Sequence, residues 1–523
     1  MGLRFAIHEM PYGEHPAFGR DHLLARADLL GGELAPMMFS VSRVTHSSAS
    51  ALQDPERARA VLVDYNLEMG NIAGAEMLAR APHGFRFLMS GQQPGLLLGP
   101  LYGFLKIVSV LAWCGRLRIM HPELLPAFWI AGEDHDILEV NRCRLGDAQF
   151  VCRFPGDIST GSVPPVHDVS LEHCRHGLIE FMTGVLPDNE FRPWLLDMVQ
   201  RVSMRDYSSF FATLTATLFR HHPVVLVEPR LLRAMAAPFL GRIVEDWDGV
   251  QAALVKGGEC VRRMGLTPPL RDAGLFRIGP SGRRKIGYDD GRFQIDGEWL
   301  TAKETAAMIS DDPEGFSPGA ALRPLVQDGL LPVAAYIAGP SELYYLWQID
   351  PLYDWLEVRR SLLAPRISAT FLDPPVTRLM ERLSLALPDL FSLDEAPAPA
   401  LESSGADLGR IRSKGNELIQ ELRAAGGGEK WLRKSIEGID YNLSRALRRL
   451  HEERLAAAGT GGERRNRVRE AVYPGGKLQE RVVSPFYFLA HHGEAFIDRC
   501  IECLNPDCRC HQVVCVSAER SES

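Results

Sequence analysis

The stretch Trp129-Ile130-Ala131-Gly132-Glu133-Asp134-His135-Asp136 decides the fold class of this chain of 523 residues. It closes an apolar run, residues 125–131, with four ionisable side chains. A short apolar run without alternation is typical of a strand that is buried on both faces of a parallel sheet. Because the carboxyl ends of parallel strands line the ligand crevice of such sheets, the stretch predicts a functional site at the sheet edge.

Four further apolar runs have the same character, at residues 85–89, 223–227, 332–338 and 361–367. Apolar residues at helical spacing follow two of them, over 101–112 and over 231–243. Alternation of strand, loop and helix is typical of right-handed crossovers in a doubly wound sheet. We therefore predict an α/β fold with a Rossmann-like parallel sheet core.

Two gaps of the core, residues 146–200 and 246–330, are too long for simple loops. The first begins with a β-like segment at 149–154, and the second contains a strand pattern at 274–278, a turn at 279–282 and a strand pair over 288–295. We predict two inserted subdomains. The core then comprises residues 1–145, 201–245 and 331–373, and a helical region follows at 374–523.

The helical region begins after Pro374-Pro375, and the sequence Ala-Pro-Ala-Pro at 396–399 predicts a linker. Spacings of four and three alternate in a short heptad seam formed by Leu432, Ile436, Ile439, Leu443, Ala446 and Leu450. This seam fits an intermolecular coiled coil and a helix packed within its own bundle equally well. Glycines at 459–462 end the helix, and residues 464–472 predict a helix that runs back.

Composition excludes several kinds of partner. A net charge of -8 with 24% charged residues is typical of an ordinary folded protein and does not favour nucleic-acid binding. The first residues lack the long apolar run of a signal peptide, and Lys106 with Pro100 disfavours a membrane span in the apolar stretch 95–115. We therefore expect a cytoplasmic protein without nucleic-acid or membrane partners.

Five of the ten cysteines lie in the pattern Cys500-x2-Cys503-x4-Cys508-x-Cys510-His511-x3-Cys515. Two cysteine pairs could hold zinc, but the Cys508-x-Cys510 spacing is unusual, and Cys500 and Cys503 fit an amphipathic helix over 494–504. We predict reduced thiols in a reducing compartment and no metal site.

The first candidate site is the segment Ser90-Gly91-Gln92-Gln93-Pro94-Gly95, which separates the first strand from the helix that Gly99-Pro100 opens. Glycines before a helix expose backbone N–H groups at its positive end and favour an anion. Gln92 and Gln93 can donate and accept hydrogen bonds, and the Lys106 side chain can reach back to the loop. A tight turn capped by the glutamines is the alternative.

The second candidate is the acidic cluster that ends the run 125–131. Clustered carboxylates hinder one another's ionisation and favour a protonated histidine, which suits acid–base catalysis or the binding of an amine or Mg²⁺. Asp136 and Glu139 also match a capping box, but that leaves Glu133 to His135 unexplained. The predicted catalytic residues are His135, Asp134, Asp136 and Lys106.

A third set of polar residues follows the later strands and is expected at the same sheet edge. Gly339-Pro340 with Glu342 also has the chemistry of a helix start. Together, the predicted substrate- or nucleotide-binding residues are Gly91, Gln92, Gln93, Gly95, Tyr102, Glu133, Arg323, Gln327, Gly339, Glu342, Arg366 and Ser368.

Taken in order, six segments carry a family resemblance: Gly91 to Gly95, Gly99-Pro100-Leu101-Tyr102, Trp129 to Asp136, Leu322-Arg323-Pro324, Gly339-Pro340-Ser341-Glu342 and Gly476-Lys477-Leu478-Gln479-Glu480-Arg481. With them the chain resembles the BshC family, the enzymes that add cysteine in bacillithiol biosynthesis. It departs from the family at Ser341, where glycine commonly stands, and in its cysteine-rich ending.

The resemblance implies a core similar to class I aminoacyl-tRNA synthetases, with two connecting-peptide insertions and a helical coiled-coil region that pairs the subunits of a homodimer. It also implies a ligase that joins cysteine to the amine of glucosaminyl malate in the last step of bacillithiol synthesis. ATP is the expected activating co-substrate, with Mg²⁺ as a candidate ion. A non-catalytic nucleotide or sugar-phosphate binding protein, or a nucleotidyltransferase acting on another amine, is the alternative.

Overall fold

The computed structural model describes residues 3–12, 37–39, 55–154, 163–280, 282–387, 408–425, part of 432–450, and 460–518. The chain divides into two compact units. Unit 1 comprises Met1–Phe371 and Lys477–Ser523, and unit 2 comprises Leu372–Gly476.

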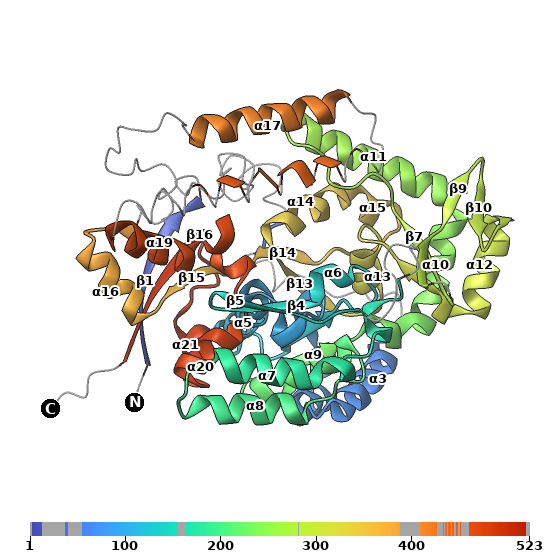
Figure 1. Ribbon diagram of the computed structural model, residues 1–523. Helices are drawn as coiled ribbons and strands as arrows, with labels where there is room; N and C mark the ends of the chain where they lie inside the picture. Colours follow the sequence, from blue (N-terminus) through green and yellow to red (C-terminus); the bar gives the residue numbers. More distant parts are fainter. Residues whose placement is uncertain are drawn as a thin grey trace. The chain divides into compact units, whose positions relative to one another are not determined.

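All five predicted core strands form, and they pair in parallel in one sheet of unit 1. In spatial order they are β14 (Leu362–Pro365), β13 (Val333–Ala338), β2 (Arg86–Gln92), β3 (Leu124–Ile130) and β6 (Val225–Val227) (Figure 1). In chain order this is 5-4-1-2-3, the doubly wound order in which the chain reverses direction at the first strand. The predicted Rossmann-like fold class is confirmed.

Neighbouring residues of each strand enter different hydrophobic clusters, which explains the continuous apolar runs. Phe87 and Met89 of β2 pack with α10 (Arg233–Glu245) and α11 (Trp247–Arg263). Leu88 packs instead in the cluster that contains Val110 of α5 (Leu101–Leu117). Because both faces of the sheet are covered, its strands have no exposed face at which polar residues would alternate with apolar ones.

The first insertion opens with a hairpin of β4 (Arg142–Leu145) and β5 (Ala148–Val151). The predicted boundary at residue 146 therefore cuts this hairpin at its turn, where Gly146 has a φ of 58°. Helices α7 (Arg175–Val185) and α8 (Phe191–Arg201) follow, and α9 (Tyr207–Leu218) leads back to β6.

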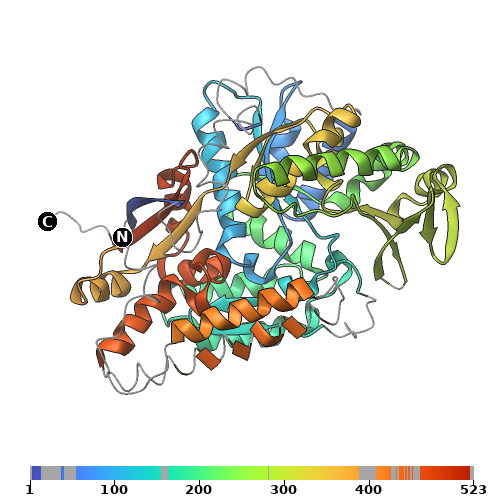
Figure 2. The ribbon, with the colours of Figure 1, turned by 90° about the horizontal axis from the view of Figure 1, so that it is seen from above.

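The second insertion begins with α11 and contains the predicted antiparallel strands. Its two small sheets have the orders β12-β7-β8 and β11-β10-β9. The strands are β7 (Leu275–Gly279), β8 (Gly282–Lys285), β9 (Gly287–Asp289), β10 (Arg292–Ile295), β11 (Glu298–Thr301) and β12 (Phe316–Pro318), with α12 (Ala302–Asp311) between the last two. In both views these strands lie at the end of unit 1 opposite β1 (Leu3–Pro11) (Figures 1 and 2). The chain returns to the core through α13 (Arg323–Leu330).

A second sheet of unit 1 has the order β1-β16-β15, with β15 (Ser368–Leu372) and β16 (Cys510–Ala518). The prediction of a helical region over all of 374–523 is wrong at its end, because residues after Lys477 belong to unit 1 and finish in the strand β16. Helices α20 (Pro485–His492) and α21 (Ala495–Cys503) precede that strand. The strand depends on pairing with β1, which lies some 500 residues away in sequence, so local pattern does not reveal it.

Unit 2 contains α16 (Pro374–Arg382), α17 (Leu408–Ala425) and α19 (Thr460–Val472), and the described residues between Leu432 and Leu450 are helical. A Cβ at Gly415 of α17 would lie within 2.1 Å of Leu443 Cδ2, so part of the predicted seam packs within the chain. Ile439 and Leu450 are 38% and 43% exposed. The predicted linker at 396–399 lies outside the described residues.

A search of the described helices for one of sufficient length and apolar character to span a bilayer finds none.

Candidate functional site

A cavity of about 330 Å³ opens at the switch point, between the carboxyl ends of β2 and β13. Ligands of doubly wound sheets bind at this place. Its lining includes eleven predicted site residues: Gly91, Gln92, Gln93, Tyr102, Lys106, Asp134, Arg323, Gln327, Gly339, Glu342 and Arg366, of which Lys106 and Arg366 are buried cations.

The segment after β2 does not form the predicted anion site. The strand continues through Gln92, and the start of α5 is already covered, since the Leu101 amide donates to the Val483 carbonyl at 2.8 Å. Gly95 lies outside the cavity wall and is packed against Gly99, where an added Cβ would lie 2.8 Å from Cα. The glycines therefore serve chain packing, and the side chains of Gln92 and Gln93 face the cavity.

Gly91 is required by the approach of β2 to β3. A Cβ at this position would lie 2.9 Å from the Trp129 carbonyl oxygen, which is too close for any side chain. The glycine lets the ends of the two central strands form one wall of the cavity.

Lys106 reaches back to the loop, as predicted, but its ammonium group is committed. Its Nζ lies 2.6 Å from the Gly91 carbonyl, 3.0 Å from Gln92 Oε1 and 2.6 Å from Glu342 Oε2. Three acceptors satisfy the three hydrogens of an ammonium group. Burial lowers the pKa of Lys106, and the Glu342 carboxylate opposes that effect. The lysine thus holds Gln92 and Glu342 in place.

Asp134 faces the cavity and is held by cations. Arg323 donates to both carboxylate oxygens, at 2.9 and 3.3 Å, and Gln93 donates at 3.1 Å. Arg283 of β8 lies 3.6 Å away. Burial alone would raise the pKa of Asp134, but the Arg323 and Arg283 guanidinium groups outweigh it and lower the pKa to about 2. The predicted mutual hindrance of ionisation is wrong for this carboxylate.

The other members of the acidic cluster point elsewhere. Glu133 is buried against Arg233 at 2.8 Å, and His135 Nδ1 accepts from Arg283 Nη1 at 3.2 Å. Asp136 is exposed and precedes α6 (Ile137–Val140) without a side-chain cap, so the capping box is absent. None of these three side chains lines the cavity. Their predicted site roles stay predictions, without a place in its wall.

Mutual hindrance of ionisation does occur at Glu139. Burial, followed by the nearby Asp136 and Asp134 carboxylates, raises its pKa. Glu139 is exposed, and it is absent from the cavity wall.

The segment after β13 lies at the predicted sheet edge and lines the cavity. Gly339 precedes α14 (Pro340–Gln348), and its amide donates to Glu342 Oε2 at 2.6 Å. Gln327 of α13 lines the cavity and donates to Asp328 Oδ1 at 3.5 Å. Tyr102 accepts from Gln92 Nε2 at 3.4 Å. Residues at the carboxyl ends of β2 and β13 and residues of two helices therefore form one wall of the cavity.

Arg366 lines the cavity from the end of β14, but its guanidinium group is paired from behind. It donates to Glu480 at 2.6 and 3.0 Å, and the two side chains are 3% and 1% exposed. Ser368 lies outside the cavity wall and donates to the same carboxylate at 2.9 Å. Burial would raise the pKa of Glu480, yet Arg366 outweighs it and lowers the pKa to about 2.

Several wall residues were not predicted. They include Tyr336, which lies within the predicted strand 332–338, Tyr345 of α14, and Arg481, which is part of the resemblance. Arg481 is exposed and has no ion-pair partner among the described residues. The wall holds four cationic side chains against two carboxylates, an excess of two positive charges, of which Glu480 neutralises one. The cavity therefore suits a polar ligand that carries negative charge.

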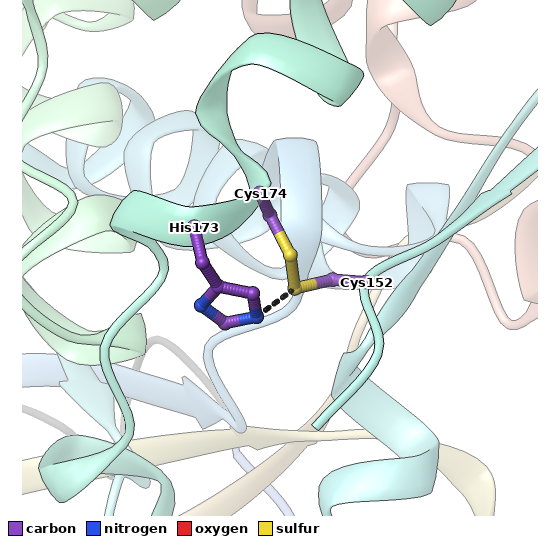
Figure 3. A group of neighbouring side chains, drawn as sticks. All are labelled: Cys152, His173 and Cys174. Atoms are coloured by element: carbon purple, nitrogen blue, oxygen red, sulfur yellow. Dashed lines mark hydrogen bonds between the residues drawn. A yellow bond between two sulfur atoms is a disulfide. The ribbon is translucent and has the colours of Figure 1, made fainter. Parts of the chain in front are cut away.

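The prediction that all cysteines are reduced is wrong at one place, because Cys152 and Cys174 form a disulfide (Figure 3). They are distant in sequence and meet only when the first insertion folds. The cysteine-rich ending does not converge as a four-ligand zinc site: only Cys508 and Cys510, with Glu9, come together among its described residues. Neither group lines the cavity.

Fold and site together define a class: a Rossmann-like α/β protein with a charged binding cavity at the switch point of its sheet. The comparisons give the family. Residues 72–367 match the model of the bacillithiol biosynthesis BshC N-terminal Rossmann-like domain, and residues 413–516 match that of the BshC C-terminal coiled-coil domain. The chain belongs to the BshC family, which confirms the resemblance.

Curated relatives agree. The chain is 29% identical to a protein of Koribacter versatilis over 85% of this chain and 86% of the relative, and 27% identical to one of Salinibacter ruber over 82% of both. It is 26% identical to one of Bacillus cereus, over 84% and 87%. Each carries the name "Putative cysteine ligase BshC". These names agree with the prediction of an enzyme of the ligase class.

Proposed function

We propose that this chain is a cysteine ligase, which joins the carboxyl group of cysteine by an amide bond to the amino group of glucosaminyl malate in the last step of bacillithiol synthesis. Family membership and the names of the relatives support the ligase. The observation that carries the substrate proposal is the charge pattern of the cavity. It offers a carboxylate, Asp134, and a cation, Arg481, which has no ion-pair partner in the part of the chain that the structure describes.

These two side chains match the two ends of the acceptor. The malate part carries carboxylates, which a guanidinium group binds with charge-assisted hydrogen bonds. The amine can donate a hydrogen bond to the Asp134 carboxylate. A carboxyl group with a pKa of about 2 is a weak base at neutral pH, so Asp134 orients the amine rather than taking its proton.

ATP belongs to this proposal as the activating co-substrate. The positive excess of the cavity wall suits a polyphosphate, while the loop before α5, the Lys106 ammonium group and the Arg323 guanidinium group are already bonded. When bound, ATP would supply an activated carboxyl group by adenylation. Both cavity carboxylates are paired with cations, so neither is free for Mg²⁺. The chain's own groups therefore bind and orient the substrates.

Reconstitution tests the proposal. The protein is incubated with cysteine, glucosaminyl malate and ATP, and the thiol product is derivatised and identified by mass. We expect bacillithiol and AMP. Nucleotide binding without product would favour the binding-module alternative, and transfer of AMP to another amine would favour a nucleotidyltransferase.

Arg481→Gln tests the charge argument. We expect KM for glucosaminyl malate to rise about tenfold or more, since a hydrogen bond to a charged group contributes about 1.5–3 kcal/mol. Arg481→Lys should recover part of that loss. The matched control is Arg80→Gln, because the Arg80 side chain is 79% exposed and lies outside the cavity wall. An unchanged KM for Arg481→Gln would remove the carboxylate-binding role.

We also propose the homodimer through unit 2. Ile439 on the predicted seam and Leu418 on α17 are 38% and 49% exposed, whereas Leu443 packs against Gly415 of its own chain. Ile439→Asp should therefore dissociate a dimer in sedimentation and leave the unit folded. A monomeric unaltered protein at micromolar concentration would contradict the pairing.

A further inference from the structure

The Cys152–Cys174 disulfide is set apart from the other cysteines of the chain. It joins residues 22 apart, with Cα atoms 5.8 Å from each other, while the other eight cysteines are not disulfide-bonded. Cys152 follows β5, and Cys174 directly precedes α7. Cys152 is 2% exposed and Cys174 is 7% exposed.

Two features beside the sulfurs favour thiolates and oppose the effect of burial. His173 Nε2 lies 3.5 Å from Cys152 Sγ and 2.9 Å from the Arg153 carbonyl (Figure 3). A carbonyl only accepts, so this nitrogen carries a hydrogen and can donate it to a Cys152 thiolate. Cys174 lies at the positive end of an 11-residue helix. Groups that stabilise the reduced thiolates make a disulfide easier to reduce.

The segment between the two cysteines holds the active-site loop. The Val166 amide donates to the Asp134 carbonyl at 2.8 Å, and the His167 amide donates to the Gly132 carbonyl at 3.0 Å. The Val163 carbonyl of the same segment accepts a hydrogen bond from the Arg283 amide at 3.1 Å. Arg283 is the cation of β8 that lies beside the Asp134 carboxylate. The segment that the disulfide closes is therefore hydrogen-bonded to two places beside this carboxylate. One is the backbone of Gly132 and Asp134, and the other is the backbone of Arg283 in β8.

We propose that Cys152–Cys174 is a thiol–disulfide exchange site for low-molecular-weight thiols, and that its oxidation state controls the order of the loop that carries Asp134. The oxidised form holds the loop in place, and the reduced form releases it. The regulatory part rests on the proposed function: an enzyme that makes a small thiol would be less active when such thiols are abundant.

The exchange needs two thiols. A thiolate of the small molecule attacks the Sγ of Cys174, which is the more exposed residue of the two. The S–S bond breaks, and Cys152 leaves as a thiolate beside the His173 donor. A second thiolate attacks the mixed disulfide on the sulfur of the small molecule and frees Cys174. Two small thiols are oxidised to one disulfide, the protein disulfide gains two electrons, and two protons complete the cysteine thiols.

Peptide mapping and hydrogen exchange on the full chain test the site without any substrate. Protein purified without reductant is alkylated before and after treatment with millimolar 2-mercaptoethanol. We expect Cys152 and Cys174 to be alkylated only after treatment, and the Val166 and His167 amides then to exchange at least about tenfold faster. The amides of β3 should be unchanged.

Three results would overturn the proposal. One is free Cys152 and Cys174 with bound zinc in the untreated protein, which would make the group with His173 a metal site. Another is a disulfide that resists 2-mercaptoethanol. The third is reduction without faster exchange at Val166 and His167.

Variants separate the site from a general effect of thiols. The double variant Cys152→Ser with Cys174→Ser should show the fast exchange permanently and should not respond to 2-mercaptoethanol. The control Cys260→Ser, whose thiol lies on α11, should respond like the unaltered protein. A double variant that still responds would contradict the assignment.

His173→Ala tests the chemistry of the leaving group. We expect reduction to slow by about threefold to tenfold, because leaving-group stability sets the exchange rate. An unchanged rate would contradict the role of His173.

Ligase activity of the reduced form, at limiting substrate, should fall at least about fivefold. If no form ligates cysteine while the exchange data hold, the proposed function fails and the exchange site stands.

Discussion

The Arg323–Asp134 pair and the Arg366–Glu480 pair both lie at the carboxyl edge of the parallel sheet, but they differ in what surrounds them. The side chains of the first are 18% and 21% exposed and border the cavity. Those of the second are 3% and 1% exposed, and the Glu480 carboxylate also accepts from Ser368 Oγ and the Ala369 amide. The first pair has room for a ligand, and the second is saturated by protein.

The two ion pairs therefore have different roles. A buried ion pair whose remaining hydrogen bonds are all made fixes the structure, and removing one partner leaves an uncompensated charge. A pair at a cavity wall holds its groups ionised and oriented for a ligand. Each pair joins an arginine to a carboxylate, and one partner of each follows a core strand, so the surroundings decide the role.

The largest expected effect is on stability, for Glu480→Gln. This change leaves the Arg366 guanidinium group buried without a counter-charge, and we expect a loss of about 3–5 kcal/mol in the free energy of unfolding. Urea unfolding followed by circular dichroism measures it. The control Glu172→Gln breaks a pair whose carboxylate is 58% exposed and should stay within about 1 kcal/mol. Equal losses for both would break the comparison.

Asp134→Asn should reverse this pattern. Ligation should fall by about a hundredfold, the size of effect seen when one preorganised electrostatic contact is lost. The free energy of unfolding should fall by less than for Glu480→Gln, because the Arg323 and Asp134 side chains are 18% and 21% exposed and water can replace part of the lost contact. Asp147→Asn, at a side chain that is 94% exposed, provides the kinetic control. An active Asp134→Asn enzyme would remove Asp134 from the site.

Acid titration of stability sharpens the contrast. The folded pKa of Glu480 is about 2, below the ordinary glutamate value of about 4.3. A depressed folded pKa contributes stability that is present above the unfolded pKa and is lost as pH falls through the folded pKa. The unaltered protein should therefore lose stability between about pH 4.3 and pH 2 more steeply than Glu480→Gln. Parallel curves would show that the pair is not coupled to folding.

The smallest effect is expected for His135→Ala. Its ring contacts Arg283 outside the cavity wall, so the ligation rate should change by less than about fivefold. The acidic cluster in the sequence had predicted His135 as a catalytic residue. If this variant loses bacillithiol synthesis in a strain lacking the ligase, while thermal melting shows a folded protein, that prediction was right and the loop rearranges on binding.

The sequence by itself determined the sheet, the two insertions and the edge where the site lies. Continuous apolar runs of five to seven residues occur only where both faces of a strand are covered, and polar residues directly after them can only stand at the carboxyl edge. Gln93, Arg323 and Glu342 were predicted to be at that edge and line the cavity. The strand order at the switch point follows from the fold class once the strands are known.

Only the tertiary structure decided what each of these residues does. The four ionisable residues after β3 are consecutive, but their side chains have different surroundings. Glu133 contacts Arg233, Asp134 lines the cavity, His135 contacts Arg283, and Asp136 is exposed to solvent. Lys106 meets Glu342, Arg366 meets Glu480 and Cys152 meets Cys174 across long stretches of chain. Hydrophobic patterning is a local property of sequence and can be read from it. The partner of a charge or a thiol depends on which distant elements pack together, and no local pattern contains that information.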